Sequence, residues 1–179
     1  SSGMGEEMAK YLAGMGWDLI LVARRADRLK SVENSLPKNI NVTLITTDLS
    51  NPENAKNLFE QVKDRKIDLL INNAGFGIFG EFVEVDLDRE IELINTNVTA
   101  VHILTKLFLQ KFLSEDKGRI INVASSAGFL AGPLMASYYA SKNYVVRLTQ
   151  AIYEELRRKK SNVHISCFCP GPVKTDFNN

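Results

Sequence analysis

The sequence contains only two cysteines in 179 residues. They are Cys167 and Cys169, one residue apart in the stretch HISCFCPG. We expect this stretch to be a strand and the two thiols to point to opposite faces of it, which argues against a disulfide or a metal site there. Buried reduced thiols suit a cytosolic protein, so the predicted location is cytoplasmic.

An excess of charge and long apolar runs are also missing. The chain carries 22 Lys+Arg against 21 Asp+Glu, for a formal net charge of +1. This balance argues against nucleic acid and anionic membrane surfaces as partners. No apolar run reaches about 18 residues, so no membrane span is predicted, and no signal peptide is visible. The opening letters SSGMGEEMAK look like the middle of a motif, so we expect the true N-terminus, with any targeting signal, to be missing.

The sequence does contain a regular alternation of short apolar runs with helical patterns. The runs are near-continuous, as in strands buried on both faces, and the helical segments repeat apolar residues every three or four positions. Asp27 is predicted to cap a short helix, and Asn51 with Pro52 to start the next one. The predicted strands are 17–23, 41–47, 67–71, 118–124 and 163–169, and the longer helices are 50–65, 86–113 and 137–160.

This order predicts an α/β fold, a Rossmann-like doubly wound parallel sheet with helices on both faces. No repeat, low-complexity tract or linker interrupts the order, so residues 1–179 are assigned to one domain. Ligands of such sheets bind beyond the carboxyl ends of the strands. The residues that follow each strand are therefore the candidates for function.

Residues near the start of the chain suit the phosphates of a dinucleotide. Gly3 and Gly5 precede a helix, where a phosphate can approach backbone N–H groups and the positive helix end; a plain tight turn is the alternative. Arg24 and Arg25 follow the first strand, and planar, permanently charged guanidinium groups suit the 2′-phosphate of NADP. A solvated basic turn would look the same. Asp48, after the next strand, is either a helix cap or an acceptor for an adenine amino group.

Polar residues also follow the later strands. In NNAG (72–75), the asparagines can brace a loop and the glycine lets a ligand come close. Asn97 lies inside a predicted helix, where asparagine is unfavourable, so it is either functional or a surface or interhelical contact. Ser125 and Ser126 end the fourth strand, and a turn with two prolines and a glycine ends the fifth.

The stretch SYYASK (137–142) places tyrosines one helical turn before a lysine. Tyr138 precedes Lys142 by four residues and Tyr139 by three, so helical geometry does not choose between them. A nearby ammonium favours the phenolate and would lower a tyrosine pKa from its usual value near ~10. The stretch is therefore either an ordinary helix start or a proton donor with the charge that tunes it.

In this order, SSGMG, NNAG, SSAG, YYASK and PGPVKT resemble the short-chain dehydrogenase/reductase family over essentially the whole chain. The resemblance implies a Rossmann-fold NAD(P)-dependent oxidoreductase with the catalytic residues Asn97, Ser125, Tyr138 and Lys142. The family spacing between serine and tyrosine favours Ser125 over Ser126 and agrees with Tyr138. The implied cofactor-binding residues are Ser1, Gly3, Gly5, Arg24, Arg25, Asp48, Asn73, Ala74, Gly75, Tyr138, Lys142, Pro170, Gly171, Val173 and Thr175.

The resemblance also implies roles for these residues. Tyr138 would protonate a carbonyl oxygen that Ser125 hydrogen-bonds, and Lys142 would lower the tyrosine pKa and bind the nicotinamide ribose. Asn97 would hold a water that relays protons. Arg24 matches the family's arginine for the 2′-phosphate, so NADP(H) is predicted over NAD(H). The family's first strand and its C-terminal lid, helix and last strand have no counterpart, so we expect a chain incomplete at both ends.

The predicted reaction is reduction of a ketone or aldehyde, or oxidation of the alcohol, with NADP(H). The alternatives are a non-catalytic dinucleotide sensor or scaffold, and an epimerase or dehydratase on the same fold. An apolar or acyl-bearing substrate is suggested by apolar residues around the presumed pocket, which loop packing would explain as well. These residues are Phe76, Ile78, Phe79, Phe129, Leu130, Leu134 and Met135.

A homodimer or homotetramer is expected, because the family pairs its two long helices, here 86–113 and 137–160. Several apolar residues on these helices are available either for that contact or for the core: Ile103, Leu104, Leu107, Phe108, Leu148 and Ile152.

Overall fold

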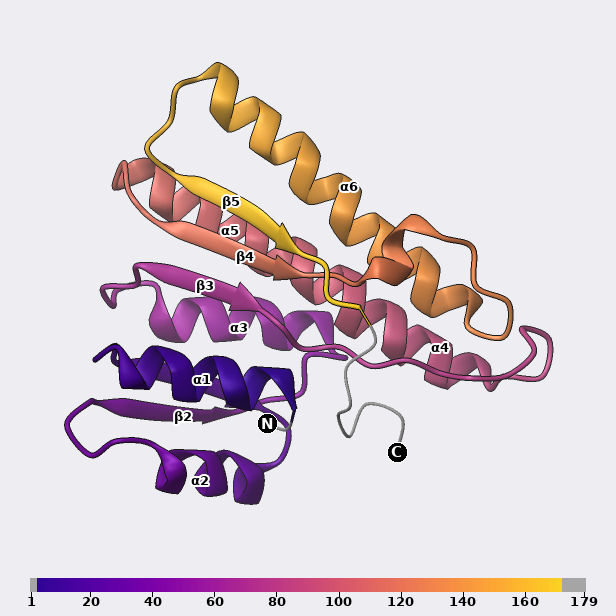
Figure 1. Ribbon diagram of the computed structural model, residues 1–179, viewed down its shortest axis with the longest axis horizontal. Coiled ribbons are helices and arrows are strands. Elements are labelled where there is room, and N and C mark those ends of the chain that lie inside the picture. The colour runs from indigo at the N-terminus through magenta and orange to yellow at the C-terminus, as the bar shows by residue number, and fades with distance from the viewer. Residues whose placement is uncertain (1–2, 172–179) are drawn as a thin grey trace. The chain divides into compact units, whose positions relative to one another are not determined.

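The structure is a computed structural model that describes residues 3–171 (Figure 1). The chain forms two compact units, of which the described parts are residues 3–48 and residues 49–171. Each unit contains a parallel sheet with its own helices.

The first unit alternates helices and strands. Strands β1 and β2 pair in parallel, from Leu19 opposite Val42 to Ala23 opposite Thr46. Ala9 and Ala13, one turn apart on the first helix, pack with Leu19, Val32 and Leu36 in one buried cluster. The elements are α1 (Met4–Gly14), β1 (Leu19–Ala23), α2 (Ala26–Ser35) and β2 (Val42–Thr46).

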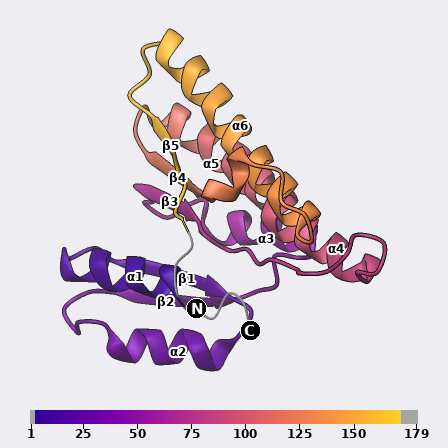
Figure 2. The same ribbon diagram turned by 45° about the vertical axis from the view of Figure 1, so that its right-hand side comes forward.

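The second unit contains a three-stranded parallel sheet in the order β3-β4-β5. Figures 1 and 2 show its three strands running in the same direction, so their carboxyl ends meet at one edge. Its elements are α3 (Pro52–Val62), β3 (Leu69–Asn72), α4 (Leu87–Ile94), the π-helical turn η1 (Asn95–Thr99), α5 (Ala100–Ser114), β4 (Arg119–Val123), the 3₁₀ turn η2 (Ser126–Phe129), α6 (Ala136–Arg158) and β5 (His164–Phe168).

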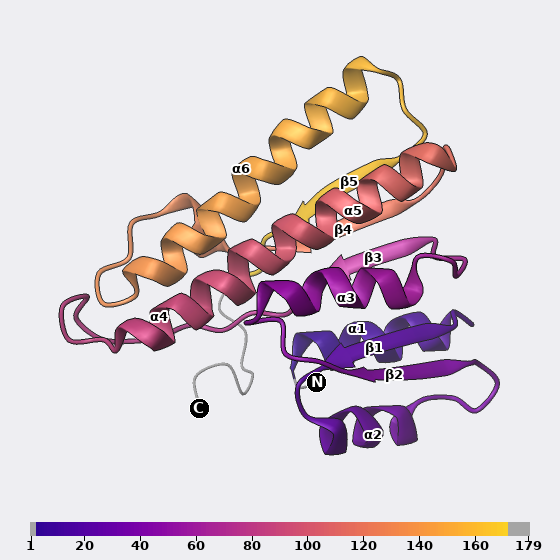
Figure 3. The ribbon, with the colours of Figure 1, turned by 180° about the vertical axis from the view of Figure 1, so that it is seen from behind.

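The helices α3, α5 and α6 of the second unit pack side by side along its sheet (Figure 3). Phe59 of α3 meets Phe108 of α5 edge to face, with ring centroids 5.2 Å apart. Val101 of α5 joins Val145 and Val146 of α6 in a buried cluster. These contacts bury about one stripe of each helix against its neighbours, as the apolar spacing predicts.

The predicted strands and helices are present, but two details of the predicted helices were wrong: the cap of α2 and the continuity of the helix 86–113. Asn51 accepts a hydrogen bond from the Glu53 N–H at 3.0 Å, and Pro52 is the first residue of α3, as predicted. Asp27 is not the cap of α2, because that helix begins at Ala26 and Arg25 occupies the N-cap, two residues before the predicted cap; Asp27 lies in the first turn instead. The predicted helix 86–113 is interrupted by the π-helical turn at 95–99.

The two cysteines correct a third prediction. The Cys169 thiol donates to the Cys167 sulfur at 3.5 Å, and both pack on the Val145–Val146 cluster. They share a side because side chains two positions apart along an extended chain point the same way, so the expectation of opposite faces was wrong. Both are free thiols. Burial raises the pKa of Cys167 to about 12.

Buried amides join the second sheet to its helices. Asn72 of β3 lies opposite Asn122 of β4, and its side-chain Nδ2 donates to Asn122 Oδ1 at 2.9 Å and to Thr105 Oγ1 of α5 at 3.1 Å. Asn122 Nδ2 donates in turn to Thr149 Oγ1 of α6 at 3.0 Å. Because these groups are buried and paired with one another, they fix the strands and helices in one alignment at the carboxyl edge.

None of the helices within residues 3–171 has the length and hydropathy needed to cross a membrane.

Replacing Asn122 by Leu tests this buried network. The variant leaves Asn72 and Thr149 without their Asn122 partner, and we expect the free energy of unfolding to fall by about 2–4 kcal/mol in urea denaturation. The matched control is Asn162→Ala, since Asn162 is exposed and bonds only Asp116 among the contacts recorded for the described residues. The control should change stability by less than about 0.5 kcal/mol. Equal stabilities for the two variants would contradict the network's role.

Candidate active site

Five of the predicted residues converge at the carboxyl edge of the second sheet. The loop after β3 brings Gly75, the turn η1 brings Asn97, the end of β4 brings Ser125, and the first turns of α6 bring Tyr138 and Lys142. All of them belong to the second unit.

Asn97 is completely buried and joins the loop to α6. Its Oδ1 accepts from the Phe76 N–H at 3.1 Å, and its Nδ2 donates to the Phe76 carbonyl at 2.9 Å and to Ser141 Oγ at 3.1 Å. The π-helical turn widens the helix at this point, a feature that recurs at functional sites. The unfavourable mid-helix asparagine is thus explained by contacts to a loop and to a second helix.

Lys142 is a buried cation, with its residue only 5% exposed. Among the described residues, its Nζ donates one recorded hydrogen bond, to the Val123 carbonyl at 3.1 Å. Burial lowers the pKa of Lys142 from 10.5 to about 8, against a smaller opposing effect of Cys167 and Cys169. Its Nζ lies 5.8 Å from the centroid of the Tyr138 ring.

Tyr138 is half-buried, and its pKa is raised above the usual value. Burial is the main cause, a hydrogen bond with the Ser125 side chain lowers the pKa, and Tyr139 adds the smallest of the three effects, in the raising direction. The expectation that Lys142 lowers this pKa is therefore not met in the protein alone. Burial of the phenol outweighs the one lowering influence, and burial also weakens the protonation of Lys142 itself.

Ser125 is held by backbone contacts from both sides. Its Oγ accepts from the Ala127 N–H at 3.1 Å, which caps the 3₁₀ turn η2, and lies 3.5 Å from the Pro170 carbonyl. The neighbouring Ser126 is exposed and uses its backbone N–H to bond Pro170 at 2.9 Å. Of these two serines, Ser125 is the one whose side chain bonds Tyr138.

Gly75 brings the backbone of the NNAG loop close to Asn97 and Lys142. A Cβ at this position would lie 3.0 Å from Asn97 Oδ1 and 3.3 Å from Lys142 Nζ. Asn73 is half-buried and Ala74 is exposed. Pro170 and Gly171 follow β5 at the same edge, where the Pro170 carbonyl contacts Ser125 and Ser126.

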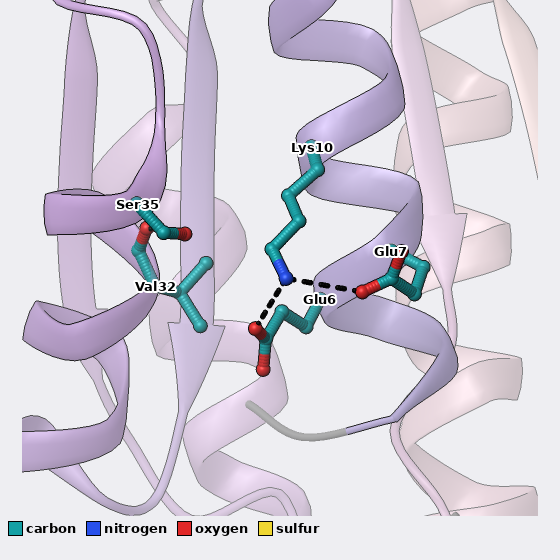
Figure 4. Close-up of polar contacts among 5 residues, drawn as sticks. All are labelled: Glu6, Glu7, Lys10, Val32 and Ser35. Atoms are coloured by element: carbon teal, nitrogen blue, oxygen red, sulfur yellow. Dashed lines mark hydrogen bonds and ion pairs between the residues drawn. The ribbon is translucent and has the colours of Figure 1, made fainter.

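The predicted residues of the first unit lie at the ends of its own elements. Gly3, with φ +62°, is the N-cap of α1, and Gly5 is in the first turn. Figure 4 shows Lys10 of α1 between Glu6 and Glu7, with ion pairs of 2.7 and 3.1 Å. These pairs raise the pKa of Lys10. They also offset part of the repulsion that two carboxylates in this turn would exert on a phosphate.

Arg24 and Arg25 are exposed directly after β1, and the described residues supply neither guanidinium with a recorded ion pair. Asp48 is half-buried, two positions beyond the end of β2. The remaining predicted cofactor residues, Ser1, Val173 and Thr175, lie outside the described residues.

A cavity of about 500 Å³ opens beside the loop that follows Gly75. Residues 77–80 and 84–86 line it together with Arg89. The Arg89 guanidinium stacks on Phe76, 5.3 Å from the ring centroid. Phe79, Phe129, Leu130 and Leu134 are exposed, whereas the predicted pocket residues Phe76, Ile78 and Met135 are half-buried.

Two contacts around α6 were not predicted from the sequence. Ser141 accepts the Asn97 amide, and Gly132 packs so tightly against the Tyr139 ring that a Cβ there would lie 2.3 Å from Cε2. The first contact had a signal, because a buried mid-helix asparagine requires partners. The second arises between a loop and a helix, for which the local sequence offers no periodic signal.

The solved structures support the observed fold. A short-chain dehydrogenase from Sphingobium yanoikuyae in complex with NADPH superposes with a TM-score of 0.91 at 30% identity, covering 98% of this chain and 69% of that one. A short chain dehydrogenase/reductase from Burkholderia phymatum in complex with NAD gives 0.88 at 31% identity, covering 98% and 64%. The Rossmann-like α/β prediction is thereby confirmed.

Sequence relatives agree with this similarity. The very-long-chain 3-oxoacyl-CoA reductase of Rattus norvegicus is 33% identical over 165 residues, covering 89% of this chain and 53% of the relative. Three curated relatives are matched over 53–58% of their length, so the chain spans little more than half of each. Residues 1–179 match the family profile described as short chain dehydrogenase. The chain therefore belongs to the short-chain dehydrogenase/reductase family.

Proposed function

We propose that the protein is an NADP(H)-dependent oxidoreductase that reduces a ketone or aldehyde, or oxidises the corresponding alcohol. The observation that carries the proposal is the hydrogen bond between Ser125 and Tyr138, with the buried Lys142 ammonium 5.8 Å from the tyrosine ring. A phenol and a hydroxyl that meet at a sheet edge can bind one carbonyl oxygen together and supply it with a proton.

Tyr138 is the proton donor in this proposal, and Ser125 orients the carbonyl oxygen. The raised pKa of Tyr138 keeps the phenol protonated at neutral pH, which suits the acid in the reducing direction. Tyr139 is a packing residue, because its ring rests on Gly132. The proposed relay water of Asn97 would use acceptor capacity of Oδ1 beyond its bond from Phe76.

The residues of the second unit fit a nicotinamide cofactor. The Lys142 ammonium has three N–H donors, and within the described part of the chain one of them is recorded as bonded, so donors remain for the hydroxyls of a ribose. Gly75 leaves the space beside Lys142 that a Cβ would fill. A bound nicotinamide dinucleotide supplies the hydride, while Tyr138 and Lys142 hold and donate the proton.

The residues of the first unit support NADP(H) over NAD(H). Arg24 and Arg25 are exposed after β1, with no ion pair recorded to any carboxylate of the described residues, so their charge is available to a 2′-phosphate. Gly3 at the start of α1 provides backbone N–H groups for phosphate oxygens. The solved relatives hold NADPH in one case and NAD in another, so the arginines carry this preference.

The substrate proposed is an apolar or acyl-bearing carbonyl compound. Phe79, Phe129 and Leu130 are each more than half exposed, and apolar side chains of this size in contact with water favour an apolar ligand. The backbone N–H of Gly80 donates to the Leu134 carbonyl at 2.8 Å, which joins the two loops that carry these side chains. The rat relative is named for 3-oxoacyl-CoA reduction, which agrees with this class.

The assembly proposed is a homodimer or homotetramer through the long helices, in the cytoplasm. Leu104 and Phe108 are buried within the second unit. Of the two predicted roles, core packing and subunit contact, these two residues therefore have the first. Ile103, Leu107, Leu148 and Ile152 are half-buried, and Leu87, Ile91 and Ile94 are exposed along one stripe of α4. These side chains are the ones available for pairing.

Burial of Lys142 favours an enzyme over a scaffold. A cation with its pKa lowered to about 8 destabilises the folded state whenever it is protonated, and a protein that only needed a stable fold would gain from an apolar residue there. The same residue is useful to a reaction that moves protons.

Replacing Tyr138 by Phe removes the proposed acid and little else. We expect turnover of NADPH with a panel of aliphatic ketones, aldehydes and 3-oxoacyl-CoA esters to fall by about 10²–10⁴-fold. NADPH affinity, followed by its fluorescence, should stay within about threefold, because Lys142 remains. The matched control is Tyr139→Phe, which keeps the ring on Gly132 and should retain turnover. Retained activity in the Tyr138 variant would remove the mechanism.

Replacing Arg24 by Ser tests the cofactor preference. The loss of a charged hydrogen bond to the 2′-phosphate should lower the affinity for NADPH by about 10–100-fold and leave the affinity for NADH almost unchanged. Arg28→Ser is the matched control, because Arg28 is also exposed and lies on α2. In thermal melts NADPH should stabilise the parent protein far more than NADH. Equal protection by the two cofactors would contradict the assignment.

Replacing Lys142 by Met should stabilise the cofactor-free protein at pH 7. The pKa of Lys142 is lower in the folded protein, about 8, than its unfolded value of 10.5, so the destabilisation is complete below pH 8 and disappears as the pH rises towards 10.5. At about 1.4 kcal/mol per pKa unit, the difference in unfolding free energy should approach about 3 kcal/mol at pH 7. Denaturant titrations of both proteins from pH 7 to 10.5 measure it; a difference that does not shrink with pH would contradict the burial argument.

A further inference from the structure

The amino end of α6 has little capping of its own. The N-cap residue Met135 makes no side-chain capping hydrogen bond to the described residues, and the first turn, 136–139, contains no acidic residue. The first backbone N–H groups of a helix lack partners within it, and the positive end of its dipole favours a nearby carboxylate. Tyr138 is the third residue of this helix, so the placement of its phenol depends on how this turn is held.

A carboxylate from another helix meets this turn. Ser137 Oγ donates a short hydrogen bond to Glu90 Oε1 of α4. Glu90 is only 9% exposed, and acids are rarely so buried unless they are paired. The residue three positions further along α4, Leu93, is fully buried, so this face of α4 points into the protein and Glu90 is directed at α6.

The same turn is held from its other side by the loop before α6. The Tyr139 ring packs against Gly132 with no room for a Cβ, and the Tyr139 N–H bonds the Met135 carbonyl at 3.1 Å. The loop therefore holds Tyr139 through Gly132, and α4 holds Ser137 through Glu90. Tyr138 lies between these two residues, and its partner Ser125 is on a separate element.

We propose that Glu90 and Ser137 are positioning residues that fix the first turn of α6, so that the Tyr138 hydroxyl stays in hydrogen-bond reach of Ser125. This inference rests on the proposed function, since it concerns the placement of the proton donor. A displacement of about 1 Å of a reacting group can lower a rate by about 10²-fold. Loss of the Glu90–Ser137 bond should therefore lower kcat more than it lowers cofactor binding.

The test compares kcat and KM in the full-length protein for Glu90→Ala, Ser137→Ala, the double variant and Glu90→Gln. The carbonyl compound is the best substrate of the panel used for Tyr138→Phe. We expect each alanine variant to lose about 10–50-fold in kcat, with the KM for NADPH within about twofold. The double variant should be no slower than the slower single one, because both remove the same contact.

Glu90→Gln keeps an oxygen that accepts from Ser137, so it should retain kcat within about threefold of the parent. Glu155→Ala is the matched control, because Glu155 is an exposed acid on α6. A purely structural role would lower thermal stability in both alanine variants without this kcat pattern or its rescue. Should Glu90→Ala not fold, Ser137→Ala decides alone, since it removes one oxygen atom.

The inference is overturned if the alanine variants keep kcat within twofold of the parent while Tyr138→Phe is inactive, or if their effects simply multiply in the double variant. An active Tyr138→Phe, or a parent that reduces no member of the panel, would instead overturn the proposed function and the inference with it. The two failures are therefore separate results.

Discussion

The arrangement of the candidate site depends on the side chain of Asn97. One buried amide bonds both backbone groups of Phe76 and the hydroxyl of Ser141, so it joins the loop after β3 to α6. Gly75 is adjacent in that loop and Lys142 is adjacent to Ser141. The distance between the loop after β3 and the buried Lys142 side chain is therefore set by one residue, in a π-helical turn that the flanking helices α4 and α5 hold in place.

The rest of the site follows from polar groups that are buried and paired. The Asn72–Asn122–Thr149 network aligns the strands with α6, and Ser125 is fixed by Ala127 and Pro170. Tyr138 and Lys142 both pay a desolvation penalty, which moves the tyrosine pKa up and the lysine pKa down. The two shifts move the two pKa values apart, so the Lys142 ammonium gives up a proton more readily than the Tyr138 phenol does, which is useful to a proton relay but not to stability.

Much of the fold could be predicted from sequence, because apolar runs, helical spacing and the Asn51–Pro52 cap are local signals. The π-helical turn could not, since one extra residue in a helix leaves no distinct period. Composition and spacing left Tyr138 and Tyr139 equivalent; the family pattern favoured the first, and the structure shows why the two differ, with Ser125 beside one and Gly132 beside the other. Contacts between distant segments, such as Ser137 with Glu90, were outside the reach of local patterns.

The central claim is that Asn97 organises a reducing site around Tyr138 and Lys142. The most direct measurement is the single-turnover rate of carbonyl reduction by NADPH in Asn97→Ala, set beside the dissociation constant for NADPH. The account predicts a rate lower by about 10²-fold or more, because the loop after β3 and α6 both lose their hydrogen bonds to the Asn97 side chain. The affinity for NADPH should stay within about fivefold of the parent value. A rate equal to that of the parent protein would contradict it.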